Sequence, residues 1–539
     1  PQQGSRFKAM ALGSFRLLRR QVPRFLRATV KRNQKRPWLA PTVAAVAGSA
    51  FAGACLAHHT AQAEAAQKYP VYSRAEVAKH TTPDSRIWVT FKDGIYDITD
   101  FVENHPGGMS KIMLAAGQAV EPFWRVYQQH YNSPLPQQLL AEMQIGVLDP
   151  SEKAVEFDMS DPYSTDPERH PGLVFHNRKP CNAELPTALM MDSWLTPNEL
   201  WFIRHHHPVP NVNPSEYRLT VEAGGRDPVV YTLEALKRFP QATVVSTIQC
   251  GGNKRSELDK IEKTSGISWG CGAMSTAEFK GVYLRDVLKH AHRLVPENAA
   301  ALGVKHVQFE AIDGCLASVP VEKVLNPYGD VLLAFEMNGQ PLPREHGFPV
   351  RVIVPGTVGI RNIKWLNKVI AHPEEAQGPW QRGIAYKGFP PGLKSFEGVD
   401  LDKVLSVQEQ PVTSTIVHPP AGTVVSPGES ITVRGIAWSG GGRGIARVDV
   451  SADNAASWTT ATLREGSEQP SNRAWAWTFW ETEIQAPKTV GSIEICSKAT
   501  DAAYNVQPES LAPYWNARGL NANAWSRVKV TVAEDPDDE

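Results

Sequence analysis

Short runs of apolar and β-branched residues, separated by polar and glycine-containing turns, recur along most of the chain. Two of these runs, 87–91 and 95–98, are joined by Lys92-Asp93-Gly94, and this spacing predicts a β-hairpin. The run 242–248 is rich in β-branched residues and predicts a buried strand. Near the C-terminus, similar runs at 430–435, 445–450, 474–479 and 528–532 lie between Gly, Ser and Asn turns, which is typical of an all-β sandwich.

The pattern divides the 539 residues into several domains, since one hydrophobic core does not support a chain of this length. Residues 68–148 combine short strands with helical periodicity, and we expect a small α+β domain there. The segment 149–171 is acidic and punctuated by proline, which predicts a semi-flexible linker. Residues 172–405 mix strands, helices and glycine turns without a strict βαβ rhythm and predict a mixed α+β domain, followed by the all-β sandwich at 406–535. The predicted fold class is therefore multidomain α+β.

Charge separates the first 66 residues from the remainder of the chain. They contain eleven Lys or Arg and one acid, Glu64, which leaves 45 basic and 55 acidic residues downstream. The arginines alternate with apolar residues, as in an amphipathic mitochondrial transit peptide. A nucleic-acid-binding tail is the alternative interpretation of such a basic segment. The acidic remainder, with no zinc knuckle, P-loop or dinucleotide fingerprint, favours a protein that does not bind nucleic acid or nucleotides.

Residues 39–57 are uncharged and rich in alanine, and they are about as long as a segment that spans a bilayer. Because alanine and glycine make this segment only weakly hydrophobic, we expect a cleaved sorting segment more than a permanent anchor. Together with the basic presequence it predicts release into the mitochondrial intermembrane space, with membrane contact at most transient. The cleavage site is not encoded in a recognisable pattern.

The six cysteines lie at positions 55, 181, 250, 271, 315 and 496, without Cys-x-x-Cys spacing. Neither a zinc site nor a disulfide framework is indicated, and we expect free thiols. Cys250 follows the predicted strand 242–248 and precedes two glycines, which let the backbone bend closely around whatever the sulfur faces. Lys254 and Arg255 follow, and their charges favour the thiolate. An inert buried thiol is the alternative.

Two histidines in 68–148 have the surroundings of haem ligands. His105 opens a His-Pro-Gly-Gly turn at the end of a predicted helical segment, and His130 follows the apolar pattern 122–127. Two imidazoles facing across an apolar pocket can bind a haem iron from both sides. This region resembles a cytochrome b5-like domain, with the motif Phe-Val-x-x-His-Pro-Gly-Gly and a distal His. The resemblance implies haem b ligated by His105 and His130, with both axial positions filled for electron transfer.

The order of motifs in 172–405 and beyond resembles the sulfite oxidase family, whose molybdenum-cofactor domain is shared with assimilatory nitrate reductase. The motifs include the Cys250 segment, the segment around Trp269 and the run Phe-Glu-Met-Asn-Gly-Gln-Pro-Leu-Pro-Arg-Glu-His-Gly-Phe-Pro-Val-Arg at 335–351. The resemblance implies that Cys250 is the protein thiolate on molybdenum, and a soft sulfur suits that metal. It also implies a set of residues that bind the pterin and its phosphate, namely Phe202, Arg204, His206, Asp313, His346, Arg351, Asn362 and Lys364.

By the same resemblance the substrate pocket is a ring of arginines with an aromatic wall. The matching positions are Arg204, Arg255 and Arg443, with Trp269 as the wall. Cationic side chains attract and orient a small dianion such as sulfite or sulfate. The alternative for each arginine alone is a surface ion pair.

The chain departs from the family pattern at several positions. Cys315 stands where the animal enzymes carry a pocket tyrosine, and Ser265 stands where a lysine is usual. His205 and His207 replace Asn and Leu on either side of His206.

The function implied by the resemblance is the oxidation of sulfite to sulfate at a molybdenum–molybdopterin centre, with electrons passing singly through haem b to cytochrome c. The acidic body favours a basic acceptor of this kind. The resemblance also implies that the sandwich at 406–535 is an immunoglobulin-like dimerisation domain, so that the protein is a homodimer. Two alternatives remain, a nitrate reductase-like enzyme without its FAD module and a non-catalytic haem-binding scaffold. The chain contains no nucleotide-binding fingerprint after the sandwich, which argues against the first.

Overall fold

The structure is a computed structural model that describes residues 69–106, 109–121, 124, 130, 133–152, 161–453 and 455–534. The chain forms two compact units, one with residues up to Gln118 and Leu140–Ala154, the other with Ala119–Leu139 and Val155–Glu539. In the described part of the chain, no helix has both the length and the apolar character needed to cross a bilayer. The basic presequence, the segment 39–57 and most of the apolar pattern 122–127 lie outside the described residues.

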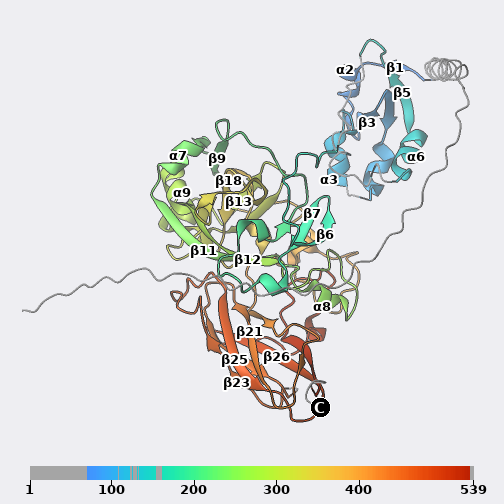
Figure 1. Cartoon of the computed structure of the whole chain (residues 1–539). Coiled ribbons are helices and arrows are strands. Elements are labelled where there is room, and N and C mark those ends of the chain that lie inside the picture. The colour runs from blue at the N-terminus through green and yellow to red at the C-terminus, as the bar shows by residue number, and fades with distance from the viewer. Residues whose placement is uncertain are drawn as a thin grey trace, which may run out of the picture. The chain divides into compact units, whose positions relative to one another are not determined.

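The first unit is built on a five-stranded sheet of order β1-β5-β4-β3-β2 (blue in Figure 1). The predicted hairpin is confirmed, because β3 pairs antiparallel with β4 across Lys92 and Asp93. Val77, Ile95 and Leu148 form the centre of its core. The strands are β1 (Val71–Tyr72), β2 (Thr81–Thr82), β3 (Arg86–Phe91), β4 (Gly94–Asp97) and β5 (Gln144–Leu148), and the helical segments here and just before β5 are α2 (Arg74–Val77), η1 (Thr99–Asn104), α3 (Met109–Ile112), η2 (Met113–Ala115) and α6 (Leu135–Glu142).

The middle of the chain forms a mixed α+β domain with three sheets, as predicted. One sheet has the order β10-β9-β18-β13-β14, a second has β11-β12-β15-β16 with β17 beside β15, and a small one has β6-β7-β8. Short helices connect these strands. The strands are β6 (Val174–Arg178), β7 (Cys181–Glu184), β8 (Ile203–Arg204), β9 (Arg218–Ala223), β10 (Val229–Thr232), β11 (Gln241–Gln249), β12 (Met274–Tyr283), β13 (His306–Ala311), β14 (Leu316–Pro320), β15 (Leu332–Met337), β16 (Gln340–Pro341), β17 (Arg351–Ile353) and β18 (Leu366–His372).

The helical segments of this domain are short, and most of them serve as connections. Longest is α9, whose Leu284, Val287 and Leu288 are buried in the core of the first of these sheets. The α-helices are α7 (Leu233–Lys237), α8 (Arg255–Asp259), α9 (Leu284–His292), α10 (Pro296–Ala299) and α11 (Val321–Leu325). The 3-10 turns are η3 (Thr187–Leu189), η4 (Asn198–Leu200), η5 (Arg344–His346), η6 (Gly359–Arg361), η7 (Ile384–Tyr386) and η8 (Leu401–Lys403).

The C-terminal part is the predicted all-β sandwich, with sheets β19-β21-β25-β24 and β20-β27-β26-β22-β23. The runs 430–435, 445–450 and 528–532 all lie in strands. The prediction of a strand at 474–479 is wrong in part, because β25 begins only at Thr478. The Trp475 side chain instead donates a hydrogen bond to Asp330 of the middle domain. The elements are β19 (Thr413–His418), β20 (Val424–Val425), β21 (Ser430–Trp438), β22 (Ile445–Ser451), β23 (Thr459–Thr460), β24 (Thr462–Leu463), β25 (Thr478–Gln485), β26 (Gly491–Asp501), η9 (Ala512–Tyr514) and β27 (Ser526–Val532).

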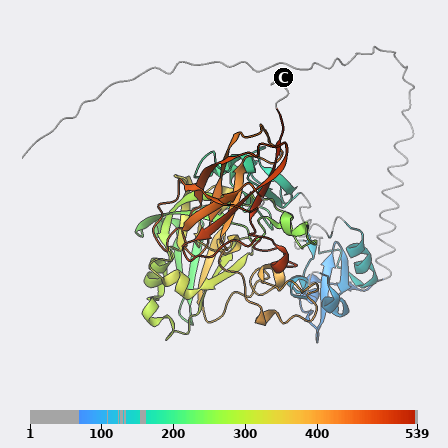
Figure 2. The ribbon, with the colours of Figure 1, turned by 90° about the horizontal axis from the view of Figure 1, so that it is seen from below.

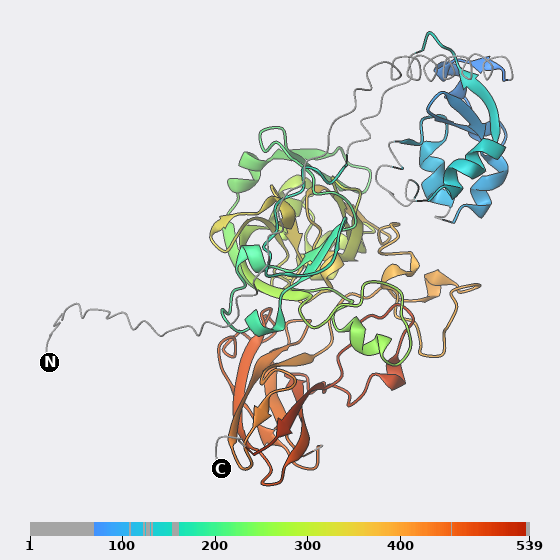
Figure 3. The ribbon, with the colours of Figure 1, turned by 45° about the vertical axis from the view of Figure 1, so that its right-hand side comes forward.

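The sandwich packs against one side of the middle domain, beneath it in the oblique view (Figure 3) and in front of it when seen from below (Figure 2). Buried hydrogen bonds join the two. The backbone N–H of Trp477 donates to Thr247 Oγ1 at 2.8 Å, and Lys254 Nζ donates to the carbonyl of Ser414 at 2.6 Å. The two domains therefore share an interface that reaches the residues around Cys250.

Strand β11 positions Cys250. It pairs along its whole length with β12, from Gln241 opposite Val282 to Gln249 opposite Met274. The predicted buried strand 242–248 is thus confirmed, and Cys250 is the first residue beyond its end. A thiol at the end of a fully paired strand is held firmly in position by the sheet.

Candidate active site

Cys250 lies in a tight turn that excludes larger residues. Its N–H donates to Ala273 O at 2.9 Å, and its Sγ accepts from the Gly252 N–H at 3.4 Å. A Cβ at Gly251 would lie 2.9 Å from Val358 and 3.4 Å from Leu520 and from Tyr386. A Cβ at Gly252 would lie 2.6 Å from the Arg255 guanidinium. The close approach predicted for the two glycines is therefore present.

A cavity opens beside Cys250, and both apolar side chains and a few convergent polar groups line it, as is usual for a cofactor site. Every residue that the sequence assigns to pterin binding lines it. These residues are Phe202, Arg204, His206, Cys250, Asp313, His346, Arg351, Asn362 and Lys364. They come from strands, 3-10 turns and loops spread over more than 160 positions, so the fold brings together what the sequence separates.

Arg204, at the end of β8, is oriented by its neighbours. Its guanidinium donates to Asn182 Oδ1 at 3.1 Å and to the carbonyl of His205, and it lies 3.4 Å from His206 Nδ1. Burial, followed by the charge of Arg204, lowers the pKa of His206 well below its usual value. His206 is therefore neutral and can donate or accept a hydrogen bond.

Arg351, at the start of β17, is almost completely buried. It donates to the carbonyls of His346 at 2.9 Å and Asn362 at 3.1 Å, and Asn362 in turn accepts from the Val354 N–H at 2.7 Å. Burial lowers the pKa of Arg351 to about 9 and that of His346 to about 3. At neutral pH the cavity wall therefore carries a guanidinium charge beside a neutral imidazole.

Lys364 carries a second buried positive charge at the cavity. Burial, followed by the nearby Arg351, lowers its pKa to about 7. Its Nζ lies 2.7 Å from His205 Nδ1 and 3.4 Å from each of two backbone carbonyls, those of Arg204 and Glu345. An anion bound here would raise this pKa by stabilising the ammonium form.

Asp313 and Cys315 lie on the turn between β13 and β14. Asp313 Oδ1 accepts from the Cys315 N–H at 3.1 Å, and Oδ2 lies 3.9 Å from His207 Nδ1. Burial, followed by the charge of Asp313, raises the pKa of the Cys315 thiol, while burial raises that of Asp313 itself. The thiol that departs from the family pattern thus lines the same cavity as Cys250 and stays protonated.

Arg255 is held behind the cavity wall in contact with three glycines. Its guanidinium donates to Ile267 O at 2.7 Å and to Gly519 O at 3.0 Å. A Cβ at Gly252, Gly266 or Gly519 would come within 2.7 Å of it. Burial lowers the pKa of Arg255, while the nearby Cys250 and Tyr386 act to raise it. The ammonium of Lys254 donates to the carbonyl of Ser414 in the sandwich.

Trp269 and Arg443 do not line the cavity. Trp269 is fully buried in the apolar cluster that contains Cys250 and Phe202, and its ring meets His176 edge-on at 4.7 Å. Arg443 follows three glycines in the sandwich and pairs with Asp501 at 3.1 Å and Glu409 at 3.0 Å. Two carboxylates therefore balance the charge of Arg443, and its part in a substrate pocket stays a prediction.

Arg518 is a further arginine near Arg255, and the sequence alone does not single it out. It is partly buried beside Arg255 and Tyr386, whose charges influence its pKa after burial has lowered it. Within the described residues its Nε is buried without a hydrogen-bond partner. The sequence feature that could have indicated Arg518 is its position beside Gly519 in a loop. Arg443 beside Gly442 has the same feature, so the sequence does not distinguish the two arginines.

The two predicted haem ligands, His105 and His130, lie in different compact units of the chain. His105 follows η1 directly, with its N–H donating to Val102 O at 3.4 Å and its ring edge-on to Phe101 at 5.8 Å. The predicted position at a helix end is confirmed. The His130 ring stacks on Trp124 at 5.3 Å. The two histidines belong to different compact units, so their joint ligation of haem iron stays a prediction.

The cavity fits a molybdopterin. Within the described residues, His206 Nε2 and Arg351 Nε are buried without hydrogen-bond partners. Such groups require a polar ligand, because leaving them unpaired costs about 1–3 kcal/mol each. Two cationic side chains, Arg351 and Lys364, suit a phosphate, and the Cys250 sulfur suits a soft metal.

Three family models match the chain. The cytochrome b5-like heme/steroid binding domain covers residues 73–149, the oxidoreductase molybdopterin binding domain covers 206–380, and the Mo-co oxidoreductase dimerisation domain covers 404–533. A solved sulfane dehydrogenase from Paracoccus pantotrophus shares the fold, with a TM-score of 0.54 and 23% identity over 75% of this chain and 99% of the other.

Curated relatives extend the likeness over nearly the whole chain. The mitochondrial sulfite oxidase of Rattus norvegicus is 46% identical over 489 residues, which is 89% of this chain and 88% of the relative. The sulfite oxidase of Gallus gallus is 47% identical over 470 residues, which is 86% of this chain and 100% of the relative. With a cavity that gathers the expected ligands around Cys250, the chain belongs to the sulfite oxidase family.

Proposed function

We propose that the protein is a molybdenum-dependent sulfite oxidase that passes electrons through a b-type haem to cytochrome c. The observation that carries this proposal is the convergence of nine predicted cofactor residues on one cavity beside the Cys250 thiol. When bound, the molybdenum–molybdopterin group supplies the two-electron oxidation of sulfite, and haem b accepts electrons singly. The protein supplies ligands, charge and orientation.

The residues of the cavity divide into two tasks. Cys250 would hold the metal, while Arg351, Lys364 and the neutral imidazoles of His206 and His346 would hold the pterin and its phosphate. The sheet and the glycine turn keep the sulfur at a fixed place, so little reorganisation accompanies metal binding.

We propose Arg204, Arg255 and Arg518 as the groups that attract and orient sulfite. Arg204 lines the cavity, and Arg255 and Arg518 are close enough to influence each other's ionisation. Among the described residues none of these three guanidinium groups forms an ion pair with a carboxylate, so together they make a positive region that favours a dianion. Arg443 is left out because Asp501 and Glu409 already pair with it.

Partners and location follow from the same proposal. The match to a dimerisation domain supports a homodimer. The mitochondrial relatives and the basic presequence support a mitochondrial protein, and the apolar segment 39–57 supports release into the intermembrane space. N-terminal sequencing of the mature protein after mitochondrial fractionation tests this, and a mature start well before position 39 contradicts it.

The function is tested by adding sulfite to the purified full-length protein without oxygen and recording the haem spectrum. We expect the spectrum of reduced haem in protein that contains molybdenum, and oxidised haem in protein without it. Nitrate is the matched competitor. Failure of sulfite to reduce the haem of molybdenum-loaded protein, or faster turnover of nitrate, contradicts the proposal.

A further inference from the structure

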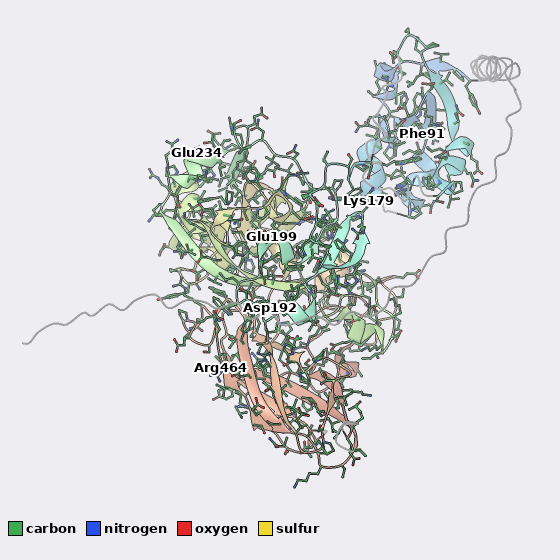
Figure 4. All side chains as sticks on the ribbon, viewed as in Figure 1. Phe91, Lys179, Asp192, Glu199, Glu234 and Arg464 are labelled. Atoms are coloured by element: carbon green, nitrogen blue, oxygen red, sulfur yellow. The ribbon has the colours of Figure 1, made fainter. Side chains whose placement is uncertain are left out.

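The end of the predicted linker is bound to the outside of the cofactor cavity. Tyr163 is 6% exposed. Asp166 Oδ1 accepts from the Val209 N–H at 2.9 Å, and Arg344 Nη2 donates to Thr165 O at 2.7 Å. Asp161 forms an ion pair with Lys179, which lies at the tip of the β6–β7 hairpin and is labelled in Figure 4. We call residues 161–172 the docked segment.

A line of polar contacts runs from the docked segment to the cavity. Arg169 lies 2.8 Å from Asp166 and donates from Nε to Glu345 Oε1 at 2.8 Å. The same Glu345 oxygen lies 3.0 Å from His205 Nε2, and His205 Nδ1 lies 2.7 Å from Lys364 Nζ. Lys364 lines the cavity. Each side chain in this line is mostly or completely buried.

The chemistry of the neighbours fixes the proton on His205. The Glu345 carboxylate can only accept a hydrogen bond, and the Lys364 ammonium can only donate one. His205 therefore carries its proton on Nε2 and uses Nδ1 as an acceptor. Burial and the surrounding charges of Lys364, Arg169 and Arg204 lower its pKa well below the usual value.

Arg169 keeps this arrangement in place by sharing the charge of Glu345. The charged and titratable groups that face His205 are Glu345, Arg169, Lys364, Arg204 and His206. Without Arg169, a second proton on the imidazole, whose Nε2 lies 3.0 Å from Glu345 Oε1, would replace the lost positive charge beside the carboxylate. Nδ1 would then become a donor and repel the Lys364 ammonium.

We propose that Arg169 and His205 are positioning residues, which hold the Lys364 ammonium toward the cofactor, and that the docked segment is therefore part of the cofactor site. This inference rests on the proposed role of Lys364 in holding the molybdopterin. It gives the residues after the haem domain a role beyond that of a tether. It also gives His205, which departs from the family pattern, a defined task as an acceptor.

The test measures how well the holoenzyme retains molybdopterin. Arg169→Gln, Arg169→Lys and the control Arg178→Gln are purified as full-length proteins, and pterin and molybdenum per haem are followed for hours after dilution at pH 6.5 and pH 8. Arg178 is an exposed arginine of β6, and its guanidinium stacks on Phe175 at 4.3 Å. Loss of outer contacts of this kind typically weakens metal sites by about 10–100-fold.

We expect Arg169→Gln to release pterin about tenfold faster than the unchanged protein, with the larger effect at pH 6.5, where His205 gains its second proton more readily. Arg169→Lys keeps the charge and should restore most of the retention, while Arg178→Gln should behave as the unchanged protein. Haem content should stay constant in all of them. Retention equal to the unchanged protein at both pH values in Arg169→Gln overturns the inference.

His205 variants provide a second test if Arg169→Gln does not fold. Asparagine can accept from Lys364 and donate to Glu345 without titrating, so His205→Asn should retain pterin at both pH values, whereas His205→Ala should lose it. In the double variant Arg169→Gln/His205→Asn, the rate of pterin release should no longer differ between pH 6.5 and pH 8. Equal retention by His205→Ala and His205→Asn contradicts the inference.

Lys364→Met separates this inference from the proposed function. If Lys364→Met retains all its pterin, the proposed cofactor role of Lys364 fails. If Lys364→Met loses pterin while Arg169→Gln and His205→Ala do not, only the positioning inference fails.

Discussion

The Cys250 sulfur is the group on which the proposed chemistry depends most directly. Replacing it in Cys250→Ser changes one atom and keeps the tight turn, but it offers the metal a hard hydroxyl in place of a soft thiolate. We expect sulfite-dependent haem reduction to fall by more than about 100-fold, with an unchanged haem spectrum and thermal midpoint. Stopped-flow measurement of haem reduction checks this, and activity within threefold of the unchanged protein contradicts it.

Arg518 and Arg443 form a matched pair for testing the substrate pocket. Charged hydrogen bonds contribute about 1.5–3 kcal/mol, so Arg518→Gln should raise the KM for sulfite by about 10–100-fold. Arg443→Gln should change KM less than twofold, because its partners are the carboxylates of Asp501 and Glu409. It should instead lower the thermal midpoint, since it leaves the fully buried Asp501 without its cation. A raised KM in Arg443→Gln together with an unchanged KM in Arg518→Gln contradicts the proposed pocket.

Lys364 predicts a pH dependence of cofactor capture. Its pKa is about 7 in the protein without cofactor, and an anionic ligand raises it. Binding above pH 7 must therefore take up a proton, and affinity should fall as pH rises, by at most about tenfold per unit. Measuring molybdopterin binding to the apoprotein between pH 7.5 and 9 checks this. A Lys364→Met variant should bind weakly at every pH in that range, and an unchanged slope in this variant contradicts the assignment.

The cofactor residues predicted from the sequence line the cavity, whereas Arg443, predicted for the substrate pocket, is paired with two carboxylates. Cys250 could be placed because a β-branched run predicts the strand before it. Arg443 and Arg518 each adjoin glycine in a loop of the sandwich, and neither hydrophobic periodicity nor charge indicates which loop reaches Cys250. That choice is made by tertiary contacts such as the 2.8 Å hydrogen bond from the Asn521 N–H to Gly251 O.

Distant contacts also decide where strand β25 begins, which is Thr478 and not position 474 as the sequence predicts. The run 474–479 has strand-like residues, but Trp475 donates from Nε1 to Asp330 Oδ2 at 2.8 Å. The backbone N–H of Trp477 donates to the side chain of Thr247 instead of to a neighbouring strand. These partners lie more than 140 positions away, so local propensity cannot foresee them.

The role of the loop 515–525 can be tested at Gly519, whose φ is +59°. In Gly519→Ala the new Cβ would lie 2.5 Å from Thr264 Oγ1 and 2.6 Å from Arg255 Nε. We expect a loss of about 2–3 kcal/mol of stability and a raised KM for sulfite, because the loop and Arg255 must move apart. Gly422→Ala is the control, since Gly422 also has a positive φ, +84°, but faces open space. It should cost only about 1 kcal/mol and leave KM unchanged; equal effects of the two variants contradict the role of the loop.

At the scale of the whole molecule, the acidic body makes a prediction about the electron acceptor. The 45 basic and 55 acidic residues after position 66 give a net charge of −10. Reduction of basic cytochrome c should slow several-fold between about 0.02 and 0.3 M salt, because screening shortens the range of attraction. Ferricyanide, an anionic acceptor, should not slow. A rate with cytochrome c that does not change with salt contradicts this steering.

The neighbouring residues Lys254 and Arg255 bond to two different stretches of the sandwich, Ser414 and Gly519. This arrangement has a consequence for biosynthesis. A ribosome releases Cys250 long before Gly519, so the wall around the thiol stays incomplete until position 519 has been made. Cofactor insertion into a finished wall must therefore follow the synthesis of that loop, and a polypeptide halted between Cys250 and Gly519 would carry the predicted metal ligand without its surroundings.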